Sequence, residues 1–487
     1  MKNDSRAGKS SAGPLFPVAF IQGRWRPARG RPVRELRNPS RWRDKIGRVP
    51  LASPADAAAA VKAAIPAQED WAKTSGRTKK KLLLDWASRL LDLKAELAGA
   101  MALEIGKPVT LGEEEVEFAL RLLLETARVL EEDPGLSPAG EPAFALLRRP
   151  VGVIGLITPW NNPLAIPVGK MAPALGYGNA AVWKPAVQAP RTATLILETL
   201  HTVGCPSGLV NMIFGEKEAA KHMISNPEVQ AVSFTGSRKA GLIVAGLAAR
   251  RPKPVQLELG GNNAALVMPD CDLEKAAREL AAAAFSFSGQ RCTAPRRFIV
   301  HKDARSRFQE ALAAAVQSLR LGLPSDPATQ VGPLISREKQ REMRDLIENS
   351  LAGGAKILCG GSTPAQWKEG CWFEPTVVMS AAPDLPVVRE ESFGPVTVLQ
   401  TAEDIGQAIE ILNGVSQGLV ASLYSEDPAY RRLFLEKAQC GVLKLNQTTL
   451  GVRPDAPFGG WKASGLGPFE HGLQDREFYT RLQTLYG

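Results

Sequence analysis

Cysteine is sparse in this sequence and never paired. The 487 residues contain six widely spaced cysteines, Cys205, Cys271, Cys292, Cys359, Cys371 and Cys440. No CxxC motif and no cysteine–histidine cluster is present. Disulfide frameworks and zinc sites both require such clustering, so the sequence favours neither and we expect no metal.

Long hydrophobic runs are missing as well. The most apolar stretch, from Val151 to Trp183, is broken by prolines, asparagines and a lysine, whereas a membrane span needs about 20 apolar residues in a row. The segment from residue 1 to residue 20 begins with basic side chains and has no continuous apolar core, unlike a secretion signal. We therefore expect a cytoplasmic protein that does not enter a membrane.

An excess of acidic residues is also lacking. The formal net charge is +10, and nine arginines lie between Arg24 and Arg48. These arginines alternate with Pro, Gly, Trp and Val in a segment typical of an edge β-ribbon, and no nucleic-acid-binding motif accompanies them. We expect no nucleic-acid partner, and the positive charge instead favours anionic cofactors and substrates.

The order of patterns along the chain predicts an α/β protein with more than one structural unit. Residues 54–133 are rich in alanine and in charged side chains at helical spacing. From Pro150, short apolar segments that end in Gly or Pro alternate with helical segments, which is typical of a doubly wound domain. A second α/β region follows from Ala264 to about Asn446, and the tail FYTRLQTLYG is expected to pair as a strand.

Three separate segments carry the residues of an acyl-transfer site. Cys292 lies in GQRCTA, in a loop after an alanine-rich helix. Glu258 ends the apolar strand of LELGG, where burial raises a carboxyl pKa toward that of a general base. Asn161, in TPWNNP, is held between prolines, so its amide is suited to donate to an oxyanion. A thiol, a base and an amide donor together predict chemistry through a thioester.

The sequence resembles the aldehyde dehydrogenase superfamily from about Phe20 onward. The resemblance rests on seven motifs in family order, PWN at 159–161, KP at 184–185, FTGS at 234–237, ELGG at 258–261, GQRC at 289–292, EESFGPV at 390–396 and PFGGWKASGLG at 457–467. It implies that Cys292 attacks an aldehyde, that Asn161 and the Cys292 N–H stabilise the oxyanion, and that Glu258 activates water to hydrolyse the thioester. A glutamate here favours a carboxylate product over the acyl-CoA made by relatives that lack it.

The resemblance also implies a site for NADP or NAD. The residues it assigns to the cofactor are Lys184, Val187, Gly236, Ser237, Glu391, Phe393 and Trp160. Gly236 and Ser237 would receive the pyrophosphate at a helix N-terminus, and Lys184 would bind the adenosine ribose. Many NAD-preferring members have a glutamate where this sequence has Val187. Its absence removes a repulsion against a 2′-phosphate, so NADP is expected to be accepted.

The domain organisation implied by the resemblance has three parts. A Rossmann-like cofactor domain would span 1–130 and 150–257, an α/β catalytic domain 258–463, and a small β bridging or oligomerisation ribbon 131–149 and 464–487. Such a ribbon would be exposed in a monomer, so we expect a homodimer or homotetramer. The segment SGLGPFEHG, at 464–472, departs from the SGxGRE common in the family.

The substrate is predicted from candidate pocket residues. These are Phe285, Phe287, Arg291 and Phe458. Aromatic walls favour an aromatic or aliphatic aldehyde. The alternative is an anionic semialdehyde, whose carboxylate would meet Arg291. A catalytically silent binding protein on the same fold is a further alternative, against which the complete set of functional residues argues.

Overall fold

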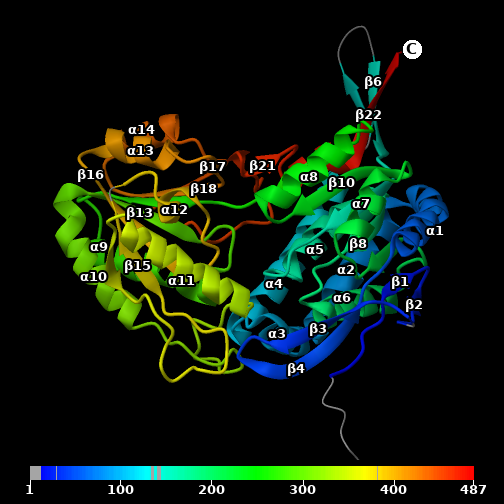
Figure 1. Ribbon diagram of the computed structural model, residues 1–487. Coiled ribbons are helices and arrows are strands. Elements are labelled where there is room, and N and C mark those ends of the chain that lie inside the picture. Colours follow the sequence, from blue (N-terminus) through cyan, green and yellow to red (C-terminus); the bar gives the residue numbers. More distant parts are fainter. Residues whose placement is uncertain (1–12, 29, 133–135, 140–143, 381, 487) are drawn as a thin grey trace, which may run out of the picture.

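The computed structural model describes residues 13–28, 30–132, 136–139, 144–380 and 382–486. Residues 1–12, which include most of the segment considered above as a secretion signal, and Arg29 of the arginine-rich segment lie outside the described residues. Within the described part, no helix has the length and apolar character needed to cross a membrane. Two α/β lobes lie side by side, and a narrow β-ribbon projects from one of them (Figure 1).

Four helices form the block expected over 54–133. They are α1 (Pro54–Ala72), α2 (Gly76–Asp92), α3 (Lys94–Ile105) and α4 (Val109–Glu132). A capping box begins α1, because the Ser53 hydroxyl accepts from the Asp56 N–H and the Asp56 carboxylate accepts from the Ser53 N–H. The helix α4 packs against α2, α3 and α5, which places one of its faces at the boundary between the lobes (Figure 1).

The sheet of the first lobe has the strand order β2-β1-β9-β8-β7-β10-β11-β21. Its parallel centre consists of β7 (Val153–Ile157), β8 (Ala180–Lys184), β9 (Val210–Ile213), β10 (Val229–Thr235) and β11 (Val255–Glu258). Its antiparallel edges are β1 (Ala19–Ile21), β2 (Arg24–Arg26) and β21 (Gly465–Leu466). The connecting helices are α5 (Ala165–Gly176), α6 (Pro190–Thr202), α7 (Lys217–Ser225) and α8 (Arg238–Ala249).

This topology confirms the doubly wound expectation. The chain runs outward from β7 to β9 and then returns to the other side of β7 with β10 and β11. Ligands of such sheets bind where the strand order reverses, at the carboxyl ends of the strands. The loops after β7 and β10 are therefore the expected place for a cofactor.

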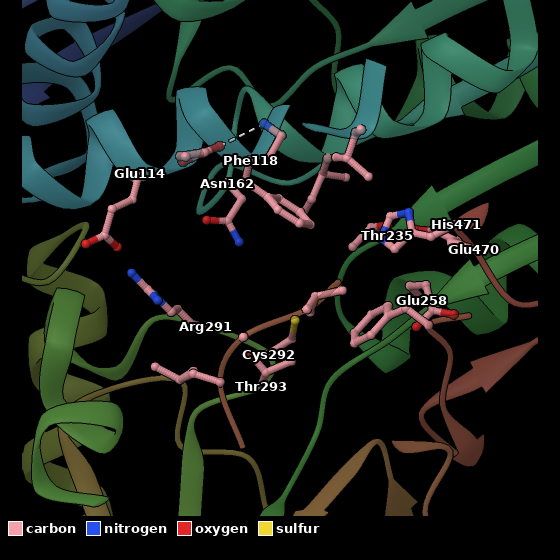
Figure 2. A pocket seen from close by; sticks show the side chains of 18 of the residues that line it. Glu114, Phe118, Asn162, Thr235, Glu258, Arg291, Cys292, Thr293, Glu470 and His471 are labelled. Carbon is pink, nitrogen blue, oxygen red and sulfur yellow. Dashed lines mark hydrogen bonds between the residues drawn. The ribbon is translucent and has the colours of Figure 1, made fainter. Parts of the chain in front are cut away.

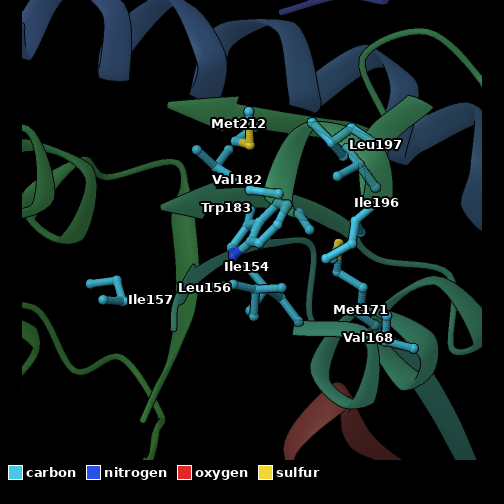
Figure 3. Close-up of a cluster of buried hydrophobic side chains, with 14 of the residues drawn as sticks. Ile154, Leu156, Ile157, Val168, Met171, Val182, Trp183, Ile196, Leu197 and Met212 are labelled. Carbon is cyan, nitrogen blue, oxygen red and sulfur yellow. The ribbon is translucent and has the colours of Figure 1, made fainter. Parts of the chain in front are cut away.

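A tryptophan anchors the core beneath that point. Trp183 of β8 is fully buried and lies among side chains of β7, β9, α5 and α6 (Figure 3). Its indole N–H donates to the Thr158 hydroxyl at 2.9 Å. Since Thr158 directly follows β7, this bond fixes the start of the loop that carries Asn161.

The sheet of the second lobe has the strand order β14-β15-β16-β13-β12-β18-β19. The strands are β12 (Asn263–Val267), β13 (Pro295–His301), β14 (Lys356–Cys359), β15 (Thr376–Met379), β16 (Val396–Ala402), β18 (Val420–Tyr424) and β19 (Val442–Leu445). The helices are α9 (Leu273–Phe285), α10 (Arg305–Gln317), α11 (Arg337–Ala352), α12 (Pro386–Arg389), α13 (Ile405–Asn413) and α14 (Pro428–Lys437). Apart from β14–β15, the described pairs are parallel. The second α/β region is thus confirmed.

Short ribbons complete the fold. The arginine-rich segment forms the antiparallel pair β3 (Val33–Asn38) and β4 (Arg41–Pro50). A second small pair joins β17 (Gln417–Gly418) to β20 (Trp461–Lys462). The projecting ribbon has the order β22-β6-β5, with β5 (Leu136–Ala139), β6 (Phe144–Pro150) and β22 (Thr480–Tyr486). The C-terminal tail therefore pairs as a strand, as the sequence predicts.

Strand pairing divides the segment 464–487, which the sequence analysis treats as one bridging unit. The strand β21 joins the first sheet through β11, and α15 (Asp475–Tyr479) contacts α5. Of the strands described in this segment, only β22 belongs to the projecting ribbon. Glycine is the reason, because a Cβ at Gly467 would lie 2.0 Å from the Val255 carbonyl oxygen. The bare backbone lets the chain lie against the sheet before it leaves for the ribbon. The other domain limits stay predictions.

Candidate active site

Cys292 lies in a tight loop between α9 and β13. Three successive residues before it have positive φ, Phe287 at 53°, Ser288 at 52° and Gly289 at 65°. Side chains other than glycine rarely adopt this conformation. Here it is held by contacts, because Phe287 is fully buried and the Ser288 hydroxyl donates to the Gly332 carbonyl oxygen.

The buried guanidinium of Arg296 fixes the same loop from β13. It donates to the carbonyl oxygens of Gly289, Arg291 and Gly394, the last two at 3.0 and 2.9 Å. Asn263 of β12 adds a further bond, from Nδ2 to the Cys292 carbonyl oxygen at 2.7 Å. The position of the thiol is therefore set by two strands of the second lobe rather than by the loop alone.

Asn161 holds the loop from the first lobe. It is buried, and its Nδ2 donates to the Gln290 carbonyl oxygen at 3.1 Å. A side-chain amide has two N–H groups, so one remains for another acceptor. The structure thus brings Asn161 of the β7 loop to the Cys292 loop, 131 residues later in the chain.

Glu258 ends β11 at the wall of the cavity beside Cys292. Its side chain is buried, and Oε2 has no hydrogen-bond partner among the described residues. Burial and the nearby Glu470 carboxylate raise the pKa of Glu258 well above its usual value, against the opposing effect of Lys170. A raised pKa suits a general base.

The cavity has a volume of about 250 Å³. The helix α4 forms one wall with a stripe of side chains at helical spacing, and the Cys292 loop, Glu258 and the C-terminal segment form the others. Lining residues include Leu111, Glu114, Glu115, Phe118, Arg121, Leu122, Asn162, Thr235, Arg291, Leu450, Val452, Phe458, Glu470 and His471. Figure 2 shows Cys292 with Arg291 on one side and Glu258 and Glu470 on the other.

Two of the four candidate pocket residues do not line this cavity. Arg291 and Phe458 do, but Phe285 is fully buried in the core of the second lobe. Phe287 is also fully buried, packed edge-on against Trp160 with ring centroids 6.2 Å apart. The expectation of an aromatic wall from these two residues is therefore wrong. The end of α9 and the positive φ of Phe287 turn both rings into the protein.

The phosphate-binding residues expected from the sequence lie at the carboxyl end of β10. The Gly236 N–H donates to the Glu258 carbonyl oxygen at 3.0 Å, and a Cβ at Gly236 would lie 2.6 Å from the Phe234 ring. Ser237 is the N-cap of α8. This turn and helix N-terminus fit a pyrophosphate, which needs bare backbone and N–H donors.

The ribose-binding candidate Lys184 lies at the carboxyl end of β8. Its ammonium donates to the Gly215 carbonyl oxygen at 3.0 Å, and burial lowers its pKa to about 8. Val187 is buried in the core. The Glu216 carboxylate, from another element, opposes this effect by raising the Lys184 pKa. Glu216 in turn pairs with Arg34 of β3 at 2.9 Å.

Glu391 and Phe393 lie in the loop between α12 and β16. The Glu391 Oε1 accepts from the Gly261 N–H at 3.2 Å, and a Cβ at Gly260 would lie 2.0 Å from its Oε2. Burial raises the Glu391 pKa to about 7, although Arg296 opposes it. The ring of Phe393 packs edge-on against Trp160 at 5.8 Å. The glycine pair therefore makes room for a carboxylate beside the Cys292 loop.

Comparison with known proteins decides the family. A family model described as the aldehyde dehydrogenase family matches residues 25–485. The chain belongs to this family. Among curated relatives, an α-ketoglutaric semialdehyde dehydrogenase of Bacillus subtilis is 31% identical, with 96% of this chain and 97% of the relative covered. A 2,5-dioxopentanoate dehydrogenase of Saccharolobus solfataricus is 34% identical, with 92% and 95% covered.

Solved aldehyde dehydrogenases share the fold. Betaine aldehyde dehydrogenase of Staphylococcus aureus, solved in complex with NAD+, has a TM-score of 0.93 at 30% identity, with 97% of this chain and 95% of that chain covered. An NAD-dependent aldehyde dehydrogenase of Sinorhizobium meliloti has a TM-score of 0.93 at 29% identity, with 97% and 94% covered. The predicted family, fold class and enzyme class are confirmed, and the protein is an oxidoreductase that acts on aldehydes.

The aldehyde dehydrogenase site contains three residues to which sequence reasoning gave no role. The buried Lys170 ammonium pairs with Glu470 and donates to the Ser233 hydroxyl at 2.7 Å. His471 stacks on Phe458 with ring centroids 6.0 Å apart. Glu470 and His471 belong to SGLGPFEHG, the segment that departs from the family pattern. That departure was the signal, but chain position alone did not show that the segment returns to the cavity.

Proposed function

We propose that this enzyme oxidises an aldehyde to a carboxylate through a thioester on Cys292. The observation that carries the proposal is that a thiol and an unpartnered buried carboxylate, Glu258, line one cavity that Asn161 borders. The Cys292 thiol loses its proton to water in the cavity, its sulfur forms a bond to the carbonyl carbon, and the carbonyl π bond opens to leave an oxyanion. The resulting oxyanion accepts hydrogen bonds from the free Asn161 N–H and from the Cys292 N–H. The carbonyl bond then re-forms as hydride leaves the carbon, which gives the thioester, and a nicotinamide cofactor, when bound, would accept this hydride.

Hydrolysis of the thioester is assigned to Glu258. Its carboxylate takes a proton from a water molecule, the water oxygen attacks the thioester carbon, and the carbon–sulfur bond breaks to release the carboxylate product and the Cys292 thiolate. The Lys170–Glu470 pair lies next to Glu258. We infer that this pair receives the proton from Glu258, since Glu470 and Glu258 line the same cavity.

NADP as well as NAD is proposed as cofactor. Support comes from the buried Val187, which supplies no carboxylate to the ribose site, and from Arg34, which neutralises Glu216. Lys184 and Arg34 are the cations that a 2′-phosphate would meet. Gly236, Ser237, Glu391, Phe393 and Trp160 are the other residues assigned to the cofactor.

A homo-oligomer and a cytoplasmic location complete the proposal. The strand β22 pairs with β6 on one edge, and its residues are exposed on both faces, including Leu482, Leu485 and Tyr486. A long apolar strand edge of this kind calls for a partner, and a second copy would form a dimer or a dimer of dimers.

The six cysteines are all free thiols, which suits a reducing compartment.

Nucleotide reduction at 340 nm, with a panel of aldehydes and both nucleotides, tests the chemistry. Turnover is expected for the wild type and must disappear in Cys292→Ala. In Glu258→Gln, we expect a burst of about one reduced nucleotide per active site followed by a stall, because the acyl-enzyme forms but is not hydrolysed. Normal steady-state turnover of this variant would show that Glu258 is not the base.

A further inference from the structure

Arg291 is a cation without a partner in the substrate cavity. It directly precedes the nucleophile, and its side chain lines the cavity and reaches toward α4 (Figure 2). Among the residues that the structure describes, the guanidinium forms no ion pair within 4.0 Å, and its buried Nε has no hydrogen-bond partner. Burial lowers the Arg291 pKa, and the charges of Glu114 and Glu115 oppose that effect. An unpaired buried donor of this kind is costly unless a ligand supplies the acceptor.

The acids near Arg291 do not provide that acceptor. Glu115 is fully buried and pairs with Lys107, and it also accepts from the N–H groups of Leu164 and Ala165. Glu114 is exposed, and its carboxylate points toward the guanidinium in Figure 2 without an ion pair within 4.0 Å. Both raise the Arg291 pKa by electrostatic attraction alone, without a hydrogen bond to the guanidinium. No described acceptor therefore satisfies the buried Nε of Arg291.

Part of the cavity wall is apolar, although Arg121 and His471 also line it. Leu111, Phe118 and Leu450 belong to this apolar part, and the rings expected from Phe285 and Phe287 are absent. Leucine side chains beside a cation suit an aliphatic chain that ends in a hydrogen-bond acceptor.

We propose that the preferred substrate is an aliphatic semialdehyde whose far end carries a carboxylate, and that Arg291 binds this carboxylate and so determines specificity. This inference rests on the proposed function, because the aldehyde carbon must lie at Cys292. The planar guanidinium can donate two parallel hydrogen bonds to a carboxylate. It thereby satisfies its own buried donors and orients the aldehyde group toward the thiol beside it.

Matched substrates of equal length test the proposal. Glutaric semialdehyde, pentanal and 5-aminopentanal are anionic, neutral and cationic at their far ends. For the wild type, we expect kcat/KM for glutaric semialdehyde to exceed that for pentanal by about 10- to 100-fold, the range of one charge-assisted hydrogen-bonded contact, and the aminoaldehyde to be poorest.

Variants test whether Arg291 itself, rather than the net positive charge of the protein, sets the preference for an anionic substrate. Arg291→Leu should lower the glutaric semialdehyde to pentanal ratio by about tenfold or more, and Arg291→Lys should restore part of it. Glu114→Gln should raise the ratio, because the opposing charge is removed. Arg344, exposed on α11 and outside the cavity lining, provides the control, and Arg344→Leu should leave the ratio unchanged.

The outcomes are distinct. A wild-type ratio near one, or a ratio that survives in Arg291→Leu, would overturn the assignment of Arg291 while leaving aldehyde oxidation intact. If Arg291→Leu does not fold, the ratio in Arg291→Lys and the opposite shift in Glu114→Gln still decide the question. If no aldehyde of any charge is oxidised, the proposed function itself fails.

Discussion

At the scale of single residues, the proposed nucleophile Cys292 lies in an environment that disfavours the thiolate. Desolvation and the carboxylates of Glu391 and Glu258 raise the Cys292 pKa to about 12, against a smaller lowering by Arg296. The thiolate is the nucleophile. The protein without cofactor therefore keeps Cys292 as a thiol at neutral pH, which protects it from unproductive reactions.

This leads to a prediction for alkylation of Cys292 in the cofactor-free enzyme. The rate with iodoacetamide should rise about tenfold per pH unit between pH 7 and 9, since the thiolate fraction grows in that way below the pKa. Glu391→Gln should alkylate faster at pH 8, because one of the charges that raise the pKa is removed. Peptide mass spectrometry, with Cys292→Ala as the control, gives the rates. A rate that is flat across this range would mean that the thiolate is already formed.

At the scale of elements, the proposed ribose end of the cofactor site involves residues of three elements. Lys184 ends β8, Glu216 is the N-cap of α7, and Arg34 comes from the β3–β4 ribbon. Glu216 stands between two cations, so it competes with a 2′-phosphate for both of them.

Glu216→Gln is therefore expected to shift cofactor preference toward NADP. Loss of the Glu216 charge frees Arg34 and Lys184 and removes the repulsion between this carboxylate and a 2′-phosphate. The ratio of kcat/KM for NADP over NAD should therefore rise several-fold, with most of the change in KM. Arg34→Gln should shift the ratio in the opposite direction. Steady-state kinetics with both nucleotides measures this, and equal ratios in all three proteins would remove Glu216 from the cofactor site.

At the scale of the whole molecule, the projecting ribbon exposes apolar side chains that nothing in a single chain covers in the part that the structure describes. Its outer strand β22 has one described partner, and Leu482, Leu485 and Tyr486 are 56%, 55% and 79% exposed. The double variant Leu482→Glu/Leu485→Glu should shift the mass in light scattering toward that of one chain of 52.3 kDa, because charges oppose burial of this strand. Leu435→Glu, at an exposed leucine of α14, is the control. An unchanged mass in the double variant would place the contact between copies elsewhere.

The sequence alone determined much of the fold and the chemistry. The strand β7 is an uninterrupted apolar run, and a strand buried on both faces can be predicted from such a run alone. The candidate catalytic residues Cys292, Glu258 and Asn161 each stand in a short local motif, at the end of a strand or after a helix. Such positions can be read from spacing, because the backbone conformation there depends on near neighbours.

Only the tertiary structure decided what these residues face. Phe285 and Phe287 are close to Cys292 in sequence, yet the turn at the end of α9 buries both rings. Glu470 raises the pKa of Glu258 although it lies far away in the sequence, because the C-terminal segment folds back to the cavity. Glu216 raises the pKa of Lys184 from the start of α7, which follows β8 and β9 in the chain. Burial, charge coupling and the direction of a side chain are properties of packing between elements, and so the missing partner of Arg291 could not be found before the fold was known.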